Sequence, residues 1–295
     1  MPENTQEIDR LDTLKDYQEE QWQCKWSPTL GNLEETHQEV WGTKEYDYKE
    51  RPTIFMGCYS YADFLTIWTH SGKKAILWCG GDILRLTRTG YWLHDSDVMT
   101  LDSKRIANWI NKNCENYCEN IWEYDELKKI GIESKIVPSF LGKVEDYQVT
   151  FKPGNKVYSS VSGDNFEQYG WHKIEAIARL NKDIDFYLYG NVGEWKSQNK
   201  NVFVRGRVDK RVMNEEIKHM QGAIRLLAED GFSEILAKSI LWGQYPIAEI
   251  EYPYMLRPHH LRMILDKKVP NFEGRNYYLK ILNDFPFNRF KNGNK

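Results

Sequence analysis

The sequence lacks paired cysteines, long apolar runs and an excess of charge, and each absence excludes a class of protein. Its five cysteines are odd in number, scattered and without CxxC spacing, at Cys24, Cys58, Cys79, Cys114 and Cys118. Neither a disulfide framework nor a zinc site is therefore indicated, and we expect reduced thiols. No apolar run approaches the roughly 20 residues that a helix needs to cross a bilayer.

The N-terminus is polar and acidic, without the basic-then-apolar order of a signal peptide, so we expect a cytoplasmic protein. A net charge of −3 offers no overall attraction for nucleic acid or an anionic membrane, and we expect no nucleic-acid partner. No G-x-G-x-x-G follows the first strand of either predicted domain, which argues against a dinucleotide oxidoreductase.

What is present is a globular composition, with 41% hydrophobic and 28% charged residues over 295 positions. This length suits two domains. We predict a polar N-terminal extension (1–50), a first domain (51–145), a second domain (146–270) and a helical tail (271–295). Within the extension, residues 9–26 predict an amphipathic helix that Ser27-Pro28 would end.

The first domain alternates between strand and helix patterns. We predict strands over 53–59, 74–78, near Tyr117 and over 135–137, and helices over 62–69, 102–113 and 122–130. This order is typical of a small Rossmann-like domain, and we expect the extension to cover one face of its sheet. Cys79-Gly80-Gly81-Asp82 follows the second strand, where small residues let a ligand approach the backbone.

The alternation restarts after a polar linker over 141–155. We predict strands over 157–161, 186–190, 202–206 and 223–227 and a fifth opened by Pro246, with helices over 170–180, 211–220 and after Gly231, and a helical tail over 259–268 and 277–282. Five strands separated by helices or loops predict a second doubly wound domain, so the fold class is α/β with two Rossmann-like domains.

One corner of the second domain stands out, at Asp230-Gly231-Phe232-Ser233. It lies where the carboxyl end of a strand meets the amino end of a helix. Open α/β sheets bind phosphorylated ligands at such corners, because the helix offers unpaired N–H groups and a partial positive charge.

Several elements in order give the second domain a resemblance to a known family. They are Gly190-Asn191 at a strand end, the segment NVFVRGRV (201–208), the segment QGAIRL (221–226), Asp230-Gly231-Phe232-Ser233 in place of E-G-F-G, and Trp242-Gly243 through Pro246-Ile247 in place of C-G-x-P-V. Residues 156–250 thus resemble the nucleotide-sugar-binding domain of GT-B glycosyltransferases, most of all the retaining GT4-like group. The element over 78–82 is similar to one in small environmental or viral-type relatives.

The resemblance implies a GT-B fold, in which two Rossmann-like domains face each other across a cleft, and a nucleotide-diphosphate sugar as donor, with no obligatory metal. It implies that Asp230 holds the sugar hydroxyls while Arg207 and Lys173 offset the charge of the leaving diphosphate. Further donor-binding residues would be Gly190, Asn191, Arg205, Arg225, Gly231, Phe232, Ser233, Glu234 and Lys238. A carbohydrate or other hydroxyl acceptor would enter beside Tyr59, Asp63 and Asp82.

The sequence departs from the family pattern at two points. The family's second glutamate falls at Lys238, which leaves Glu234 or a different base as alternatives in nucleotide recognition. Tyr169-Gly170 fills the family's K-G position, with Lys173 three residues further on.

Several candidate residues also have a structural interpretation. Arg207 and Arg225 could be ion-pair partners, Asp230 could stabilise the start of the helix, and Asp82 could cap the following segment. The D-x-D sequences at 95–97 and 183–185 lack the surroundings of a metal site.

Two other functions stay open on the same fold. One is a phage-type glycosyltransferase that modifies DNA bases, which requires a basic groove. The other is a non-catalytic GT-B-like protein that binds a nucleotide or a partner. The departure at Lys238 favours the second of these.

Overall fold

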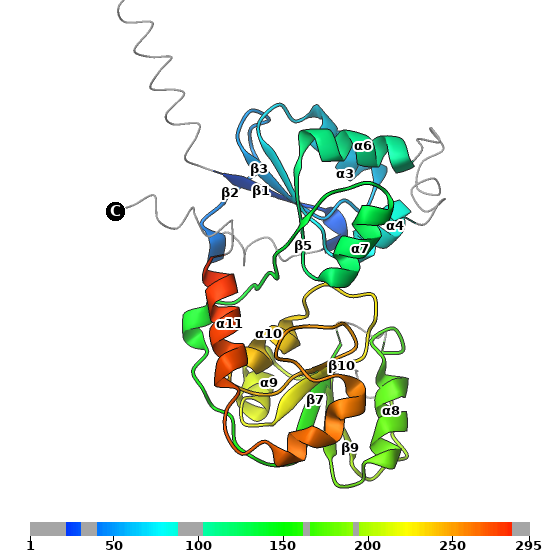
Figure 1. Cartoon of the computed structure of the whole chain (residues 1–295), viewed down its shortest axis with the longest axis vertical. Helices are drawn as coiled ribbons and strands as arrows, with labels where there is room; N and C mark the ends of the chain where they lie inside the picture. The colour runs from blue at the N-terminus through cyan, green and yellow to red at the C-terminus, as the bar shows by residue number, and fades with distance from the viewer. Residues whose placement is uncertain (1–21, 31–39, 88–102, 162–165, 191–194, 285–295) are drawn as a thin grey trace, which may run out of the picture. The chain divides into compact units, whose positions relative to one another are not determined.

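The chain forms two compact units in a computed structural model that describes residues 22–30, 40–87, 103–161, 166–190 and 195–284 (Figure 1). Unit 1 contains residues 1–142 and 284–295, and unit 2 contains Lys143–Asn283. Each unit is built on a sheet of parallel strands, as predicted. All five cysteines are described and unpaired. Within the described ranges, no helix combines the length and apolarity that a bilayer span requires.

The sheet of unit 1 has six parallel strands in the order β2-β1-β3-β4-β5-β6. The predicted strands and helices of this domain are confirmed. The strands are β1 (Gln23–Trp26), β2 (Lys44–Glu45), β3 (Thr53–Met56), β4 (Lys74–Leu77), β5 (Glu115–Cys118) and β6 (Lys135–Ile136), and the helices are α3 (Tyr61–Thr69), α4 (Gly81–Thr87), α6 (Ser103–Asn113) and α7 (Ile121–Lys129), with a 3-10 turn η1 (Pro28–Leu30).

Side chains of β3 alternate between two apolar layers, as the period of a strand dictates. Phe55 packs in the layer that contains helix residues such as Phe64 and Ile67. Ile54 packs in the other layer, with Trp41 from the N-terminal segment. Part of the predicted extension therefore covers a face of the sheet, as expected.

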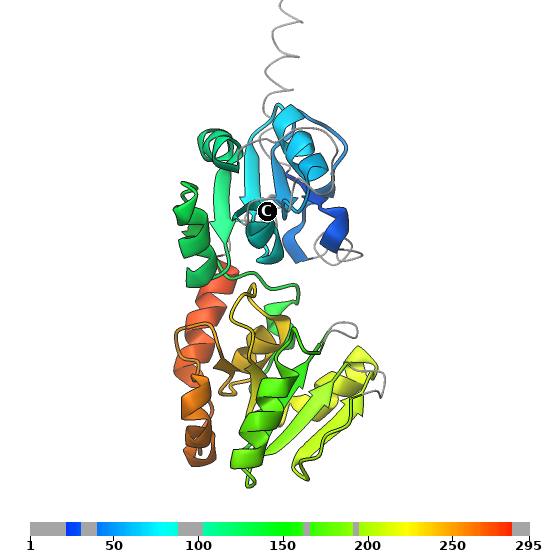
Figure 2. The same ribbon diagram turned by 90° about the vertical axis from the view of Figure 1, so that its right-hand side faces the viewer.

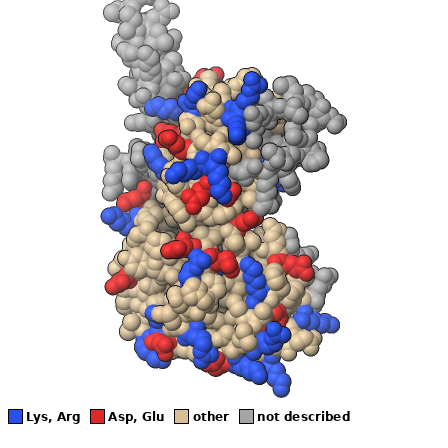
Figure 3. Space-filling model, turned by 45° about the vertical axis from the view of Figure 1, so that its right-hand side comes forward, with Lys and Arg blue, Asp and Glu red and all other residues tan. Residues whose placement is uncertain are grey.

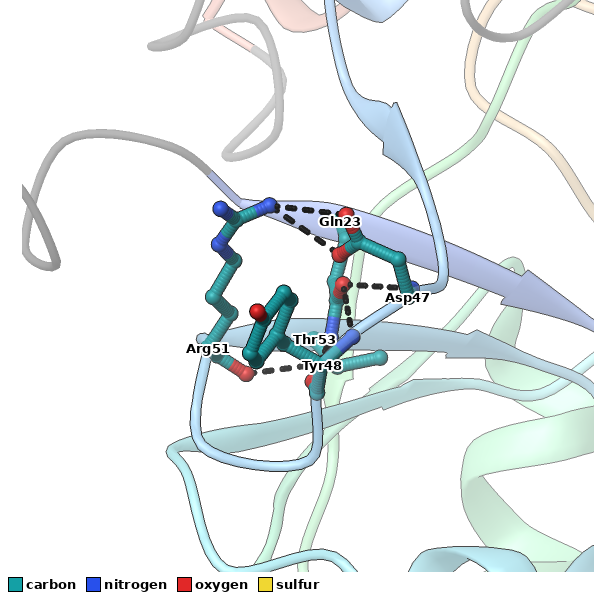
Figure 4. A network of polar contacts seen from close by, with 5 residues as sticks. All are labelled: Gln23, Asp47, Tyr48, Arg51 and Thr53. Carbon is teal, nitrogen blue, oxygen red and sulfur yellow. Dashed lines mark hydrogen bonds and ion pairs between the residues drawn. The ribbon is translucent and has the colours of Figure 1, made fainter.

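The prediction of a helix over 9–26 is wrong where the structure describes it, because Gln23–Trp26 is strand β1, paired in parallel with all of β3. Residues 9–21 lie outside the described residues. Gln23 is fully buried, and its side-chain oxygen accepts hydrogen bonds from the N–H groups of Asp47 (3.0 Å) and Tyr48 (3.2 Å) while its nitrogen donates to Thr53 (2.9 Å; Figure 4). These contacts come from distant residues, which a four-residue pattern does not reveal.

The sheet of unit 2 has five parallel strands in the order β11-β10-β7-β8-β9, which confirms the predicted doubly wound domain. The opening strand of the corner ends at Arg225, earlier than predicted. The strands are β7 (Lys156–Ser160), β8 (Asp185–Tyr189), β9 (Val202–Gly206), β10 (Gly222–Arg225) and β11 (Ile247–Ala248), and the helices are α8 (Trp171–Leu180), α9 (Lys210–Ile217), α10 (Glu234–Leu241) and α11 (Phe272–Asn283), with 3-10 segments η2 (Val144–Asp146) and η3 (Pro258–Asp266).

The core of unit 2 holds these elements in place. Phe186 of β8 packs with Trp171 and Ile174 of α8, which lies along the sheet in Figure 2. A buried amide ties α10 to α9 and β7. The Gln244 oxygen accepts hydrogen bonds from the Tyr158 and Ser239 hydroxyls, each at 2.9 Å, and its nitrogen donates to the carbonyl of residue 217. Because the five strands are parallel, their carboxyl ends meet at one edge of the sheet.

Candidate active site

Two glycines let the strand ends of unit 2 approach closely. Gly190, after β8, has φ +110°, and a Cβ there would lie 2.1 Å from the carbonyl oxygen of Val161 after β7. Gly170, before α8, has φ +76°, and a Cβ there would lie 2.5 Å from the carbonyl oxygen of Leu226 after β10. Both positions require glycine. The predicted donor-binding residue Asn191 lies outside the described residues.

Two helices begin at this edge without a side-chain cap. Gly170 is the N-cap of α8 and has no side chain to accept a hydrogen bond. Ser233 is the N-cap of α10, and within the described residues its side chain accepts no capping hydrogen bond. Because the first N–H groups of a helix have no partner within the helix, both N-termini are suited to an anion.

Asp230 is held by a buried arginine. The Nε of Arg225, which is 8% exposed, donates to Asp230 Oδ2 at 2.6 Å, and its Nη1 donates to the Ser160 carbonyl at 3.2 Å. The Arg225 guanidinium also lies 4.2 Å from the centroid of the Tyr169 ring. Arg225 is thus committed to protein partners. Asp230 precedes α10 by four residues, so the interpretation of it as a first-turn acid is wrong.

The four predicted cations at this edge differ in their availability. Arg207, just after β9, is exposed and makes no ion pair with any described residue. Lys173, in the first turn of α8, is 42% exposed at its side chain, with Nζ 3.5 Å from Glu249 Oε2. Arg205 is engaged by Glu216 of α9 through contacts of 3.2 and 2.7 Å, and this ion pair lowers the pKa of Glu216. Among the described residues, Arg207 is therefore unpaired, and Lys173 is paired at a longer distance than Arg205 or Arg225.

Sequence reasoning missed Glu249 as a member of this edge. Its N–H donates to the carbonyl of Arg225 at 3.0 Å, and its carboxylate faces Lys173. The signal was present, because Glu249 comes directly after the short strand that Pro246 opens. Tyr169 was noted only as a departure from the family pattern, whereas its ring covers the guanidinium of Arg225.

Two other predicted donor-binding residues are core residues. Lys238 is 3% exposed, and its Nζ lies 3.5 Å from Oε2 of Glu234, one turn earlier on α10. Burial lowers the pKa of Lys238, although the Glu234 charge opposes that shift. Phe232 is 6% exposed and packs between Tyr252 and Tyr278, at ring-centroid distances of 5.4 and 5.5 Å.

In unit 1, the predicted acceptor-side residue Asp82 is fully buried. Its Oδ2 accepts the N–H of Cys58 at 3.0 Å, and its Oδ1 accepts those of Cys79 at 3.0 Å and Ile83 at 2.9 Å. Burial raises the pKa of Asp82 to about 6, because the desolvation of its charged form outweighs these hydrogen bonds. Asp82 joins the loops that follow β3 and β4.

Asp63 and Tyr59 complete the same compact edge. Asp63 forms a capping box with Ser60 at the start of α3 and accepts further hydrogen bonds from Ser27 (2.9 Å) and the Tyr59 N–H (3.0 Å). Tyr59 is 7% exposed, and its ring lies where a Cβ on Gly57 would be, at 2.4 Å. The structure brings the three predicted acceptor-side residues together, but it uses them to hold loops.

The second D-x-D sequence is occupied by structural contacts. Asp183 forms two hydrogen bonds of 2.9 Å with Arg262, and Asp185 is the first residue of β8. The first D-x-D sequence, at 95–97, lies outside the described residues. Among the described residues, no group of three or more His, Cys, Asp or Glu side chains is arranged to hold a metal ion.

Comparison with solved structures identifies the fold, whereas no protein-family model and no curated protein matches the sequence. Sucrose-phosphate synthase from Thermosynechococcus elongatus aligns with a TM-score of 0.53 and 11% identity over 81% of this chain and 71% of that one. HepE from Anabaena, solved in complex with UDP and glucose, aligns with a TM-score of 0.51 and 12% identity over 80% of this chain and 76% of that one.

TarM aligns with a TM-score of 0.50 and 15% identity over 83% of this chain, which spans only 52% of TarM. The α,α-trehalose-phosphate synthase from Burkholderia xenovorans, solved with glucose-6-phosphate, aligns with a TM-score of 0.52 and 6% identity over 83% of this chain and 72% of that one. The chain itself has two sheets of parallel strands, each accompanied by helices. The chain therefore has the fold of the GT-B glycosyltransferases.

Proposed function

We propose that this protein is a glycosyltransferase that moves a sugar from a nucleotide-diphosphate donor to a hydroxyl acceptor. One observation carries the proposal. At one edge of the unit 2 sheet, two helix N-termini without a side-chain cap lie with an acid that a buried arginine orients and with Arg207, which makes no ion pair with any described residue. The fold supports it, since HepE shares that fold and was solved with UDP and glucose.

In this proposal the donor diphosphate binds at the N-termini of α8 and α10. Each N-terminus contributes the partial positive charge of its helix and backbone N–H groups that no side chain caps, worth roughly 0.3–2 kcal/mol per interaction. Arg207 and Lys173 offset the negative charge that develops on the diphosphate as it leaves, which lowers the barrier to transfer. The proposal includes no obligatory metal, because these two cations serve the leaving group.

Asp230 accepts hydrogen bonds from the donor sugar, and Arg225 fixes the direction in which its carboxylate points. Glu234, in the first turn of α10, keeps a third of its side chain exposed. We assign it to the ribose, in place of the acid that the family pattern puts at position 238. Lys238 then holds the Glu234 carboxylate. Transfer with retention of configuration is the stereochemistry that we propose.

The acceptor is proposed to be a carbohydrate or another hydroxyl compound that enters at the edge of unit 1. Tyr59, Asp63 and Asp82 shape the loops there. The net charge of −3 disfavours a nucleic-acid acceptor. On the face of the molecule drawn in Figure 3, basic and acidic side chains are interspersed.

Calorimetric titration with UDP- and GDP-sugars tests the proposal. We expect one donor to bind, and Arg207→Ala to weaken that binding. The absence of any nucleotide binding at about millimolar concentration would refute the proposal.

Asp230→Ala tests the catalytic role directly. It should reduce turnover by about tenfold or more, with Asp230→Asn as the control that keeps the shape of the side chain. Donor binding without hydrolysis or transfer by the wild-type protein would instead support the non-catalytic alternative. A larger loss of stability than of turnover would make Asp230 a structural residue.

A further inference from the structure

Unit 2 contains a surface pocket at the opposite end of its strands from the candidate active site. The pocket has a volume of about 520 Å³, within the range of small-molecule sites. Its lining includes Tyr245, two residues before β11, and residues between η3 and α11. The candidate active site follows the carboxyl ends of the strands, whereas Tyr245 precedes β11 at its amino end.

Large apolar side chains are exposed around this pocket. Phe272 is 53% exposed, Tyr254 is 48% exposed and Val269 is 62% exposed. The Tyr254 ring is extended by the ring of Tyr277, 38% exposed, at a centroid distance of 5.3 Å. Exposed apolar residues that cluster in this way mark binding surfaces, in contrast to single ones scattered over a surface.

The backbone of Tyr254 is strained. Its φ of 61° makes it the sole non-glycine residue with a positive φ among those that the structure describes. A bulky residue in this region is strained, and such strain is maintained only by surrounding contacts. The buried side chain of Asn271 provides them, because its Nδ2 donates to the Tyr254 carbonyl at 3.1 Å and its Oδ1 accepts from Gly274 at 3.0 Å.

The pocket also has one charge of each sign. Lys267 Nζ lies 4.8 Å from the centroid of the Tyr245 ring, and Glu273 lies at the start of α11. Neither side chain forms an ion pair with another residue in the described part of the chain. The two charges cancel, so the pocket has no net attraction for a phosphate or for an anionic membrane, which requires several basic residues.

We propose that this pocket is a second binding site of the protein and that its ligand is a neutral carbohydrate. A sugar ring has an apolar C–H face that packs on exposed aromatic rings, and its hydroxyls accept hydrogen bonds from Lys267 and donate them to Glu273. The exposed aromatic rings, the Lys267 donor and the Glu273 acceptor together suit such a ligand, and the balance of the two charges favours a neutral one. The inference does not depend on the proposed transferase activity.

Titration of the full-length chain with cellobiose, maltose and diacetylchitobiose, up to about 10 mM, tests this site. We expect at least one disaccharide to bind. Phe272→Ala and Tyr254→Gly should each weaken binding by about fivefold or more. Tyr254→Gly also relieves the strained backbone, so its melting temperature should be equal to or higher than that of the wild type. A loss of sugar binding in this variant is therefore not a loss of folding.

Asp230→Ala is the matched control, because it alters the candidate active site alone. It should leave disaccharide affinity unchanged, whereas a loss of affinity would place the sugar at the candidate active site and overturn the proposal. The proposal also fails if no disaccharide binds, or if binding survives both pocket substitutions. Binding of anionic phospholipid vesicles that depends on Phe272, without sugar binding, would make the pocket a membrane contact.

Discussion

The carboxyl edges of the two sheets hold similar residues in opposite states. In unit 1, Asp82 is fully buried and accepts three backbone N–H groups, and Tyr59 is 7% exposed. In unit 2, Arg207 is exposed without an ion-pair partner among the described residues, and two helices begin without caps. An acidic residue that follows glycines at the end of a strand is therefore not enough to indicate a ligand-binding site. What distinguishes a site is whether its polar groups are already satisfied.

Asp82→Ala should give the largest effect on stability. It would leave three N–H groups without an acceptor where water has no access, at a cost of about 3 kcal/mol or more. Denaturant unfolding should show this loss, and hydrogen exchange should locate it at Cys58, Cys79 and Ile83. Donor affinity measured by calorimetry should stay within about twofold. Lost turnover at unchanged stability would instead make Asp82 an active-site residue.

Arg207→Ala should have the reverse profile, with a loss of turnover of about tenfold or more and a melting temperature within about 2 °C of the wild type. Arg205→Ala is the matched control, since Arg205 lies two residues earlier and is already paired with Glu216. Its loss of turnover should be below about threefold. Equal effects of the two substitutions would contradict the assignment of Arg207 to the leaving group.

The raised pKa of Asp82 predicts a pH dependence that Asp82→Asn should remove. The folded-state pKa of about 6 exceeds the ordinary value of 3.8, so the folded state binds the proton more tightly. This stabilisation is complete below pH 3.8 and is lost as the pH rises to about 6. Between pH 4 and pH 7 the wild type should lose about 2 kcal/mol relative to the variant in urea unfolding. A parallel pH dependence of the two proteins would show that Asp82 does not titrate in this range.

Lys238→Met should have the smallest effect on the free energy of unfolding. It keeps the buried volume but removes the charge beside Glu234, and we expect a loss of about 1 kcal/mol because Glu234 is partly exposed. Adding Glu234→Gln should recover most of that loss, as a double-mutant cycle in thermal unfolding would show. An unrecovered loss would mean that Lys238 acts through packing alone.

The strands and helices of both units were predictable where hydrophobic periodicity was strong. The run before Met56 and the segment of α8 have such patterns, and both are confirmed. Strand β1 was missed because it has four residues and depends on its pairing with β3. Helix α11 begins at Phe272, before the predicted 277, because the side chain of Asn271 accepts the N–H of Gly274.

The candidate site was predictable only as a location. The glycines and charged residues after the strands of unit 2 indicated the edge, because parallel strands end together. Which cation is available was not predictable from Arg205, Arg207 and Arg225, since all three lie in or just after the last residues of a strand. Glu216 pairs with Arg205 and Asp230 pairs with Arg225, which leaves Arg207 available.

The amino-acid sequence alone was enough to predict two α/β domains, and it led to the prediction of a phosphate-binding corner at Asp230-Gly231. These features follow from periodicities and turn residues that act over a few positions. Which polar groups remain available to a ligand depends on contacts that form only in the folded chain. One of the N–H groups that Asp82 accepts comes from a residue 24 positions away, and Arg225 donates to a carbonyl 65 positions away. Such pairings arise when the sheet brings distant strand ends together, and no local pattern encodes them.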